Sequence, residues 1–318
     1  MGNPLRIIFM GTPDFAVPSL RALHDSRFTV IEVVTQPDRP RGRGRKLQPP
    51  PVKAAAQALE YPVLQPESPR APEFAKRLSE SDPDLFVVIA FGHILPRKLL
   101  DIPRLGAVNI HASLLPKYRG PAPIHWAILN RETETGITAI QMDTGMDTGD
   151  MLLKKSLEIR ADETTGSLHD RLADLGADVL IQTLAKIETG TLQPVPQEDR
   201  LSTYAPPLET KQGHIDWSKS AKELDAFIRG MTPWPGAFTF RGKKRLKVFK
   251  GKPLSIDHSE QPGTVLPGFP DELRVATGEG ALSVLALQGP SGKRLSIDDF
   301  LRGRSEEHTS ELQSLLII

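Results

Sequence analysis

The 318-residue sequence contains no cysteine, which excludes disulfide frameworks, thiolate metal sites and cysteine nucleophiles. It contains no apolar run of about 18 residues, so no membrane span is expected. Its eight histidines form neither an HxxxH nor an HExxH pair, the patterns typical of zinc enzymes. We therefore expect neither a bound metal nor a membrane partner.

The first residues, MGNPLRIIFMGTPDF, lack the features of a targeting segment. They contain no basic start followed by an apolar stretch, and no amphipathic leader rich in arginine and serine. Such segments direct secretion or import into organelles. We therefore expect a cytoplasmic protein.

Short apolar runs rich in β-branched residues alternate with helix-like stretches in the first half of the sequence. The predicted strands are residues 5–10, 30–35, 85–90, 107–110 and 136–142. Several are apolar at consecutive positions, which is typical of strands covered on both faces. Helices are predicted from residue 17, over residues 71–81 and over residues 165–189. This alternation predicts an α/β fold with a doubly wound, mostly parallel sheet.

A proline-rich stretch without periodicity divides the chain. Residues 192–208 read LQPVPQEDRLSTYAPPL, a composition typical of a linker. A helix is predicted after it, over residues 216–230 with Ser218 as its N-cap, followed by short strand-like runs between Gly/Pro turns. We therefore expect a first domain of residues 1–190, a linker of residues 191–208, and a small antiparallel barrel or sandwich of residues 209–304.

The last residues are set apart by their sequence. Residues 304–314 read RSEEHTSELQS, which is also the translation of a common sequencing-adapter string. We interpret residues 305–318 as a non-native tail and assign no function to them.

Basic side chains gather in two segments, although the net charge is only +1. Residues 39–46 carry five cations, with glycines and prolines that we expect to prevent helix and strand. Residues 241–252 carry seven cations and no acid, and residues 205–304 together hold 16 basic and 11 acidic side chains. Flexible cationic loops and basic strand ribbons suit phosphate backbones. A solvated loop and a charged edge strand are the alternatives; two such segments in different domains favour a nucleic-acid partner.

Chemistry is expected at the ends of two predicted strands. The turn after the first strand has one glycine instead of GxGxxG, which disfavours a dinucleotide-dependent dehydrogenase.

Asn109 and His111 lie two residues apart, so they point to the same face of a strand. An amide beside an imidazole can stabilise an oxyanion and move a proton; capping of nearby loop backbone is the alternative.

The aspartates of the segment 141–151, QMDTGMDTGDM, can make tight turns. One of them can instead reach the histidine and orient its ring. Metal binding by the cluster is a third possibility, disfavoured because no second acidic cluster is evident.

The sequence resembles the methionyl-tRNA formyltransferase family over about residues 5–303. The resemblance rests on IIFMGTPDFA (7–16), TQPDRPRGRGRKL (35–47), NIHASLLPKYRGPAPI (109–124), QMDTGMDTGDML (141–152) and IDWSKSAKEL with PWPGA (215–237). It implies a Rossmann-type, formyltransferase-like N-terminal domain and an OB-like β-barrel that binds tRNA. It also implies formyl transfer from 10-formyltetrahydrofolate, as a co-substrate, to the α-amino group of methionyl initiator tRNA by an enzyme that we expect to be monomeric.

The resemblance also implies roles for individual residues. Asn109 and His111 would polarise the formyl oxygen, and Asp147 would orient His111 and assist proton transfer. The folate site would be lined by Ser113, Leu114, Leu115 and Pro116. The tRNA contacts would be Arg39, Arg41, Arg43, Arg45 and Lys46 in one loop, with Arg43 foremost, and Lys243, Lys244, Arg245 and Lys247 in the second domain.

The sequence departs from the family pattern at Ala112, where glycine is expected, and at His125-Trp126. An alanine at position 112 would crowd the loop if that position required a positive φ. Two rival functions remain: a folate-dependent formyltransferase acting on a small amine, and a tRNA-binding protein without catalytic activity.

Overall fold

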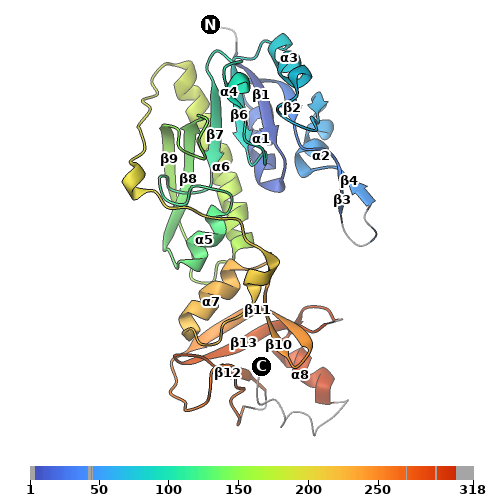
Figure 1. The fold of residues 1–318 in the computed structure, drawn as a ribbon, viewed down its shortest axis with the longest axis vertical. Helices are drawn as coiled ribbons and strands as arrows, with labels where there is room; N and C mark the ends of the chain where they lie inside the picture. The colour runs from blue at the N-terminus through green and yellow to red at the C-terminus, as the bar shows by residue number, and fades with distance from the viewer. Residues whose placement is uncertain (1–3, 42–43, 45, 270, 291, 306–318) are drawn as a thin grey trace. The chain divides into compact units, whose positions relative to one another are not determined.

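The computed structural model describes residues 4–41, 44, 46–269, 271–290 and 292–305 (Figure 1). It divides into two compact units. Unit 1 comprises residues 1–123, 134–158 and 169–205, and unit 2 comprises residues 124–133, 159–168 and 206–318. Two predicted tRNA contacts, Arg43 and Arg45, and residues 306–318 of the predicted tail lie outside the described residues.

Unit 1 is built on a seven-stranded sheet with the order β5-β2-β1-β6-β7-β8-β9 (Figure 1). The strands are β1 (Arg6–Gly11), β2 (Thr29–Val34), β5 (Val63–Leu64), β6 (Leu85–Ile89), β7 (Ala107–His111), β8 (Glu134–Gln141) and β9 (Met151–Glu158). The first five strands of this order pair in parallel, whereas β8 and β9 pair antiparallel. The predicted, mostly parallel α/β sheet is therefore confirmed.

Helices lie between the strands along the chain. They are η1 (Asp14–Ala16), α1 (Val17–His24), α2 (Pro51–Ala58), α3 (Pro72–Glu80), α4 (Arg97–Leu100), α5 (Pro123–Leu129) and α6 (Thr165–Glu188), with η2 (Asp199–Leu201) after them. Proline begins α2, α3 and α5, because its missing N–H and fixed φ suit the first turn of a helix. Within the described residues, no helix is both long and apolar enough to cross a membrane.

The sheet of unit 1 buries both of its faces, as the apolar run of β6 predicts. On one face, Phe74 and Leu78 of α3 share a buried cluster with Ile8, Met10, Phe86 and Val88 of the strands. On the other face, a Cβ added at Gly176 of α6 would contact Ile110 and Ile137. Each fully buried side chain of this kind contributes about 1.5–3 kcal/mol to folding.

The basic segment of residues 39–46 ends in regular structure, which the sequence argument did not expect. Arg39–Arg41 (β3) pairs antiparallel with Lys46–Gln48 (β4) as a two-stranded hairpin. The expectation that glycines and prolines would prevent strands here is wrong, because Pro40 lies within β3 and Gly44 lies in a turn. Beside the hairpin, the Asp38 carboxylate accepts two 2.8 Å hydrogen bonds from Lys53 Nζ.

Unit 2 contains a five-stranded antiparallel sheet with the order β10-β11-β13-β12, and β14 pairs with β13. The strands are β10 (Ala237–Arg241), β11 (Lys244–Leu254), β12 (Leu273–Ala276), β13 (Ala281–Gln288) and β14 (Leu295–Ser296). The helices η3 (Thr210–Gly213), α7 (Ala221–Gly230) and α8 (Ile297–Ser305) accompany it. Leu224 and Ile228 of α7 pack into one buried cluster with Val248 and Val284 of the sheet.

The start of α7 corrects one prediction. Its N-cap is Ser220, whose Oγ accepts a hydrogen bond from the Glu223 amide while the Glu223 carboxylate accepts one from the Ser220 amide. Ser218, the predicted N-cap, instead donates its hydroxyl to Asp216 at 2.6 Å. The Ser-x-x-Glu spacing of a capping box begins at position 220 and not at 218, and this decides the start of the helix.

Candidate active site

The strand β7 carries two polar side chains near the end of the unit 1 sheet at which its parallel strands finish. Ala107 belongs to the buried cluster under α3, and the side chains of a strand alternate between its faces. Asn109 and His111 therefore point to the same face of the sheet as Ala107. His111 is the last residue of β7, so both lie near the carboxyl end of the strand. The parallel strands β1, β6 and β7 all end at this edge, where open α/β sheets bind their ligands.

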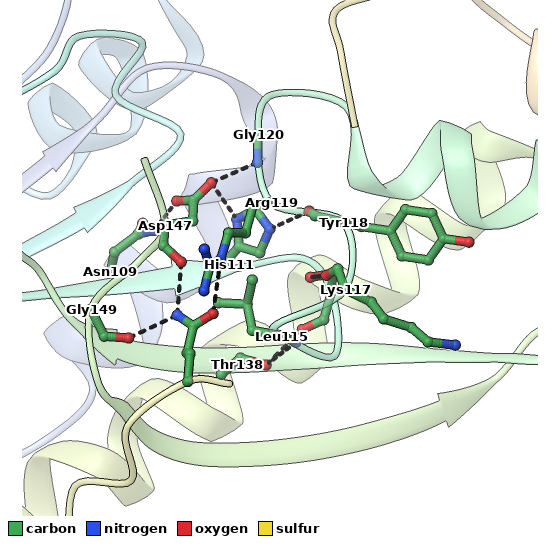
Figure 2. A network of polar contacts seen from close by, with 12 residues as sticks. Asn109, His111, Leu115, Lys117, Tyr118, Arg119, Gly120, Thr138, Asp147 and Gly149 are labelled. Atoms are coloured by element: carbon green, nitrogen blue, oxygen red, sulfur yellow. Dashed lines mark hydrogen bonds and ion pairs between the residues drawn. The ribbon is translucent and has the colours of Figure 1, made fainter. Parts of the chain in front are cut away.

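The Asp147 carboxylate brings these two side chains into one group (Figure 2). Its Oδ1 accepts a hydrogen bond from Asn109 Nδ2 at 3.4 Å, and its Oδ2 accepts one from the Gly120 amide at 2.8 Å. The same Oδ2 lies 3.6 Å from His111 Nδ1. The carboxylate is 17% exposed and the imidazole 7% exposed, so the charges of this group act in a medium of reduced dielectric.

The backbone around His111 determines which ring nitrogen is available for chemistry. Its Nε2 lies 2.9 Å from the carbonyl oxygen of Tyr118 (Figure 2). Because a carbonyl can only accept, Nε2 carries the proton of this hydrogen bond. In the neutral ring the lone pair is therefore on Nδ1, which faces Asp147. The 3.6 Å separation is longer than a hydrogen bond, so the carboxylate does not occupy Nδ1.

The loop that carries Asp147 has an unusual backbone. Asp147 has a φ of 55°, in the left-handed region that few residues other than glycine adopt. Two residues later, a Cβ added at Gly149 would collide with the Gln141 carbonyl oxygen, so only glycine fits there. Within the loop, Asp143 accepts hydrogen bonds from the Thr148 hydroxyl at 2.7 and 2.9 Å. Asp143 thus follows the turn interpretation, whereas Asp147 belongs to the polar group.

Sequence reasoning missed two side chains next to this group. Gln197, in the segment predicted as a linker, donates from Nε2 to the carbonyl oxygens of Asp147 and Gly149 at 2.7 and 2.8 Å. Its Oε1 accepts from Arg119 Nε at 3.0 Å. The segment 191–205 belongs to unit 1. Its prolines and lack of periodicity contain no signal that would separate Gln197 from a linker residue.

The chain matches two family models in succession. Residues 5–184 match the formyl transferase model, and residues 207–305 match the model of the formyl transferase C-terminal domain. A methionyl-tRNA formyltransferase of Citrifermentans bemidjiense is 52% identical over 94% of this chain and 93% of the relative. That of Caldanaerobacter subterraneus is 49% identical over 95% of this chain and 97% of the relative. The chain belongs to the methionyl-tRNA formyltransferase family.

More distant solved structures share the fold of this family. WlaRD, a sugar 3N-formyl transferase crystallised with dTDP and 5-N-formyl-THF, matches 92% of this chain and all of its own, with a TM-score of 0.66 at 19% identity. HypX from Aquifex aeolicus in complex with tetrahydrofolic acid matches 93% of this chain and 47% of its own, with a TM-score of 0.61 at 18% identity. At these identities the likeness concerns the fold alone.

The segment that the family resemblance assigns to folate is tightly held. The Ser113 hydroxyl donates to the Lys117 carbonyl at 2.7 Å, and Leu115 is fully buried. The Leu115 carbonyl accepts a 2.6 Å hydrogen bond from Lys154 Nζ, and burial lowers the pKa of that amine. Leu114 and Pro116 are half-buried. The accessible side chains of the segment are therefore those of Leu114 and Pro116, and its folate contact stays a prediction.

The side chains predicted to bind tRNA lie in both units, and their role stays a prediction. In unit 1, Arg39 and Lys46 are exposed on the β3–β4 hairpin, and Arg41 is in β3. In unit 2, Lys243 is exposed in the turn before β11, Lys244 is exposed at the first position of β11, and Lys247 is half-buried. The Arg245 guanidinium lies over the Phe238 ring, 3.6 Å from its centroid, so the ring stabilises its charge.

Both departures from the family pattern have a structural account. Ala112 is buried and its φ is not positive, so the methyl group meets no strain there. His125 contacts the Trp234 carbonyl through Nε2 at 3.2 Å, and Trp126 donates from its indole N–H to the Pro206 carbonyl at 2.8 Å. Trp126 also packs against the buried cluster of unit 2. The pair therefore anchors the start of α5 within unit 2.

Proposed function

We propose that the protein transfers the formyl group of 10-formyltetrahydrofolate to the α-amino group of methionine esterified to initiator tRNA. The observation that carries this proposal is the convergence of Asn109, His111 and Asp147 at the carboxyl end of β7. About 50% identity to methionyl-tRNA formyltransferases over nearly the whole chain supports the acceptor. The exposed basic residues of the β3–β4 hairpin and of β11 support a polyanionic partner.

The proposed reaction is a direct acyl transfer without an enzyme-bound intermediate. The neutral amine attacks the formyl carbon, a C–N bond forms, and the carbonyl oxygen becomes an oxyanion. Asn109 Nδ2 donates to that oxygen. The bond from the formyl carbon to N10 of the folate then breaks, and N10 needs a proton. The amine has one to lose, so the site must move a proton between the two nitrogens.

His111 is suited to this proton transfer. Because Nε2 is engaged by the Tyr118 carbonyl, Nδ1 is the position that accepts a proton from the amine. The resulting imidazolium faces the Asp147 carboxylate at 3.6 Å, which stabilises it. It then donates this one proton from Nδ1, through a bound water, to the departing N10, while the oxyanion re-forms the carbonyl. Asp147 thus assists the transfer by holding opposite charge beside the ring.

A formylation assay with purified protein tests the proposal. Product formation that requires both 10-formyltetrahydrofolate and methionyl initiator tRNA is the expected result. Nucleotide-linked amino sugars and small ribonucleotide amines serve as competing acceptors. Formylation of one of these with no formylation of methionyl-tRNA would establish the small-amine function instead. Binding of tRNA with no folate-dependent turnover would establish a non-catalytic binding protein.

A further inference from the structure

Gln197 reaches the reaction site from a segment whose sequence is typical of a linker. Its side-chain amide is fully engaged as a donor, with both Nε2 hydrogens directed to backbone carbonyls of the Asp147 loop, at 2.7 Å to Asp147 and 2.8 Å to Gly149. A primary amide has two N–H donors. Both donors of the side chain are therefore bonded to the two backbone carbonyls on either side of Thr148.

The Asp147 loop depends on contacts from outside itself. A non-glycine residue with a φ of 55° costs about 1–2 kcal/mol relative to a right-handed conformation, less for aspartate than for most residues. Such a conformation persists only where the surroundings determine it. Inside the loop, Asp143 bonds to the amide of Gly145 and the hydroxyl of Thr148. From outside the loop, Gln197 binds the backbone carbonyls of Asp147 and Gly149.

The same side chain is linked to the second loop that holds the carboxylate. Gln197 Oε1 accepts a hydrogen bond from Arg119 Nε at 3.0 Å, and Arg119 Nη2 donates to Asp199 at 2.8 Å. The residue after Arg119 is Gly120, whose amide donates to Asp147 Oδ2 at 2.8 Å. Gln197 thus connects the backbone that carries Asp147 with the backbone that binds its carboxylate.

We infer that Gln197 is a positioning residue for formyl transfer: it fixes the Asp147 carboxylate relative to His111 Nδ1 and Asn109 Nδ2. This inference rests on the proposed function. The two distances that it controls, 3.6 and 3.4 Å, lie at or beyond the upper limit of a hydrogen bond. A small displacement of the loop would therefore break the hydrogen bond from Asn109 and move the carboxylate farther from His111 Nδ1. Misplacement of a reacting group by about 1 Å can cost on the order of a hundredfold in rate.

The variant Gln197→Glu isolates the two donor bonds. It keeps the size of the side chain and keeps an acceptor for Arg119, but it places a carboxylate against two carbonyl oxygens. The expected result is a fall in kcat of roughly 10- to 100-fold, with little change in KM for either substrate. Gln193→Glu is the matched control, because Gln193 is exposed in the same segment and undergoes the same change of charge. That control should keep the wild-type kcat.

A double-mutant cycle separates positioning from a general loss of structure. If Gln197 acts through Asp147, Gln197→Glu should lower kcat by less than about twofold in an Asp147→Asn background. If it only supports the fold, its effect should multiply with that of Asp147→Asn. Gln197→Met, which removes the donors without adding charge, covers the case in which Gln197→Glu does not fold. Tetrahydrofolate binding and thermal unfolding are measured for every variant.

The outcomes are distinct. Wild-type protein that does not formylate methionyl-tRNA contradicts the proposed function, and the same variants are then compared with the acceptor that is formylated. An active wild type together with full kcat in both Gln197 variants overturns the positioning role. Loss of folding in both Gln197 variants, or multiplicative effects in the cycle, also overturns it. The positioning role is supported if Gln197→Glu lowers kcat with folate binding intact, and if this loss of kcat disappears in the Asp147→Asn background.

Discussion

The variant Asp147→Asn removes the negative charge beside His111 and keeps the size of the side chain. Asparagine has the shape of aspartate and tolerates the left-handed φ of 55° that this position requires. Its oxygen can still accept the Gly120 amide, 2.8 Å from Asp147 Oδ2. Its NH₂ group then faces Asn109 Nδ2, where two donors meet and no hydrogen bond forms. The imidazolium formed at His111 would lose its opposite charge.

The expected effect on the reaction is larger than the effect on the fold. Groups that assist proton transfer typically contribute about 10²–10⁴-fold to the rate, which corresponds to about 2.7–5.4 kcal/mol in the activation barrier. The net loss of stability should stay below about 1.5 kcal/mol, because the Gly120 bond is weakened and not removed. Asp147→Ala would add about 1–2 kcal/mol of backbone strain, since alanine lacks a polar group that favours this φ.

The assay is single-turnover formylation of methionyl-tRNA with saturating folate, together with denaturant unfolding of both proteins. The prediction is a drop in the single-turnover rate of at least about a hundredfold for Asp147→Asn, with tetrahydrofolate binding retained. A rate within about threefold of wild type would refute the catalytic role of this carboxylate.

Arg43→Ala should lower kcat/KM for methionyl-tRNA about tenfold by removing a phosphate contact, with tetrahydrofolate affinity unchanged; equal loss of both in the kinetic and binding assays would mark the hairpin as structural. Gly149→Ala should destabilise the protein by about 1–3 kcal/mol, because the new methyl group meets the Gln141 carbonyl; an unchanged Tm would contradict the rigidity of that loop. Asp84 is partly buried, which raises its pKa. Hydrogen bonds donated by the Arg6 amide and by the Arg104 side chain nevertheless bring this pKa below the usual 3.8. A carboxyl of this kind stabilises the fold above its unfolded-state pKa, and the contribution is lost as the pH falls through the folded-state value. Asp84→Asn should therefore lower the free energy of unfolding at pH 7, and the difference from wild type should shrink below about pH 4; a deficit that persists at pH 2 would show that charge is not its cause.

The sheet and its longest helix could be predicted because their burial leaves a strong pattern. β6 is LFVVI, apolar at every position and buried at every position, as expected of a strand covered on both faces. The α6 helix was predicted over 165–189 and runs from Thr165 to Glu188. β9 was missed, since MLLKKSLE is a half-exposed edge strand whose lysines dilute the apolar signal.

The candidate site was accessible to sequence reasoning only in part. Asn109 and His111 could be paired from their spacing, because the period of a strand is two. Asp147 could be chosen among its neighbours only through the family resemblance, since aspartates in such a segment equally make turns. Gln197 could not be found, because a contact between residues 50 positions apart depends on tertiary packing that a proline-rich segment does not encode.

We propose that Asn109, His111 and Asp147 together carry out formyl transfer to methionyl-tRNA. The most direct test is the single-turnover rate of His111→Ala against wild type, with 10-formyltetrahydrofolate and methionyl initiator tRNA both saturating. We expect measurable wild-type transfer and a variant that is slower by at least about a hundredfold, with tetrahydrofolate binding intact. Equal rates in the two proteins would contradict it.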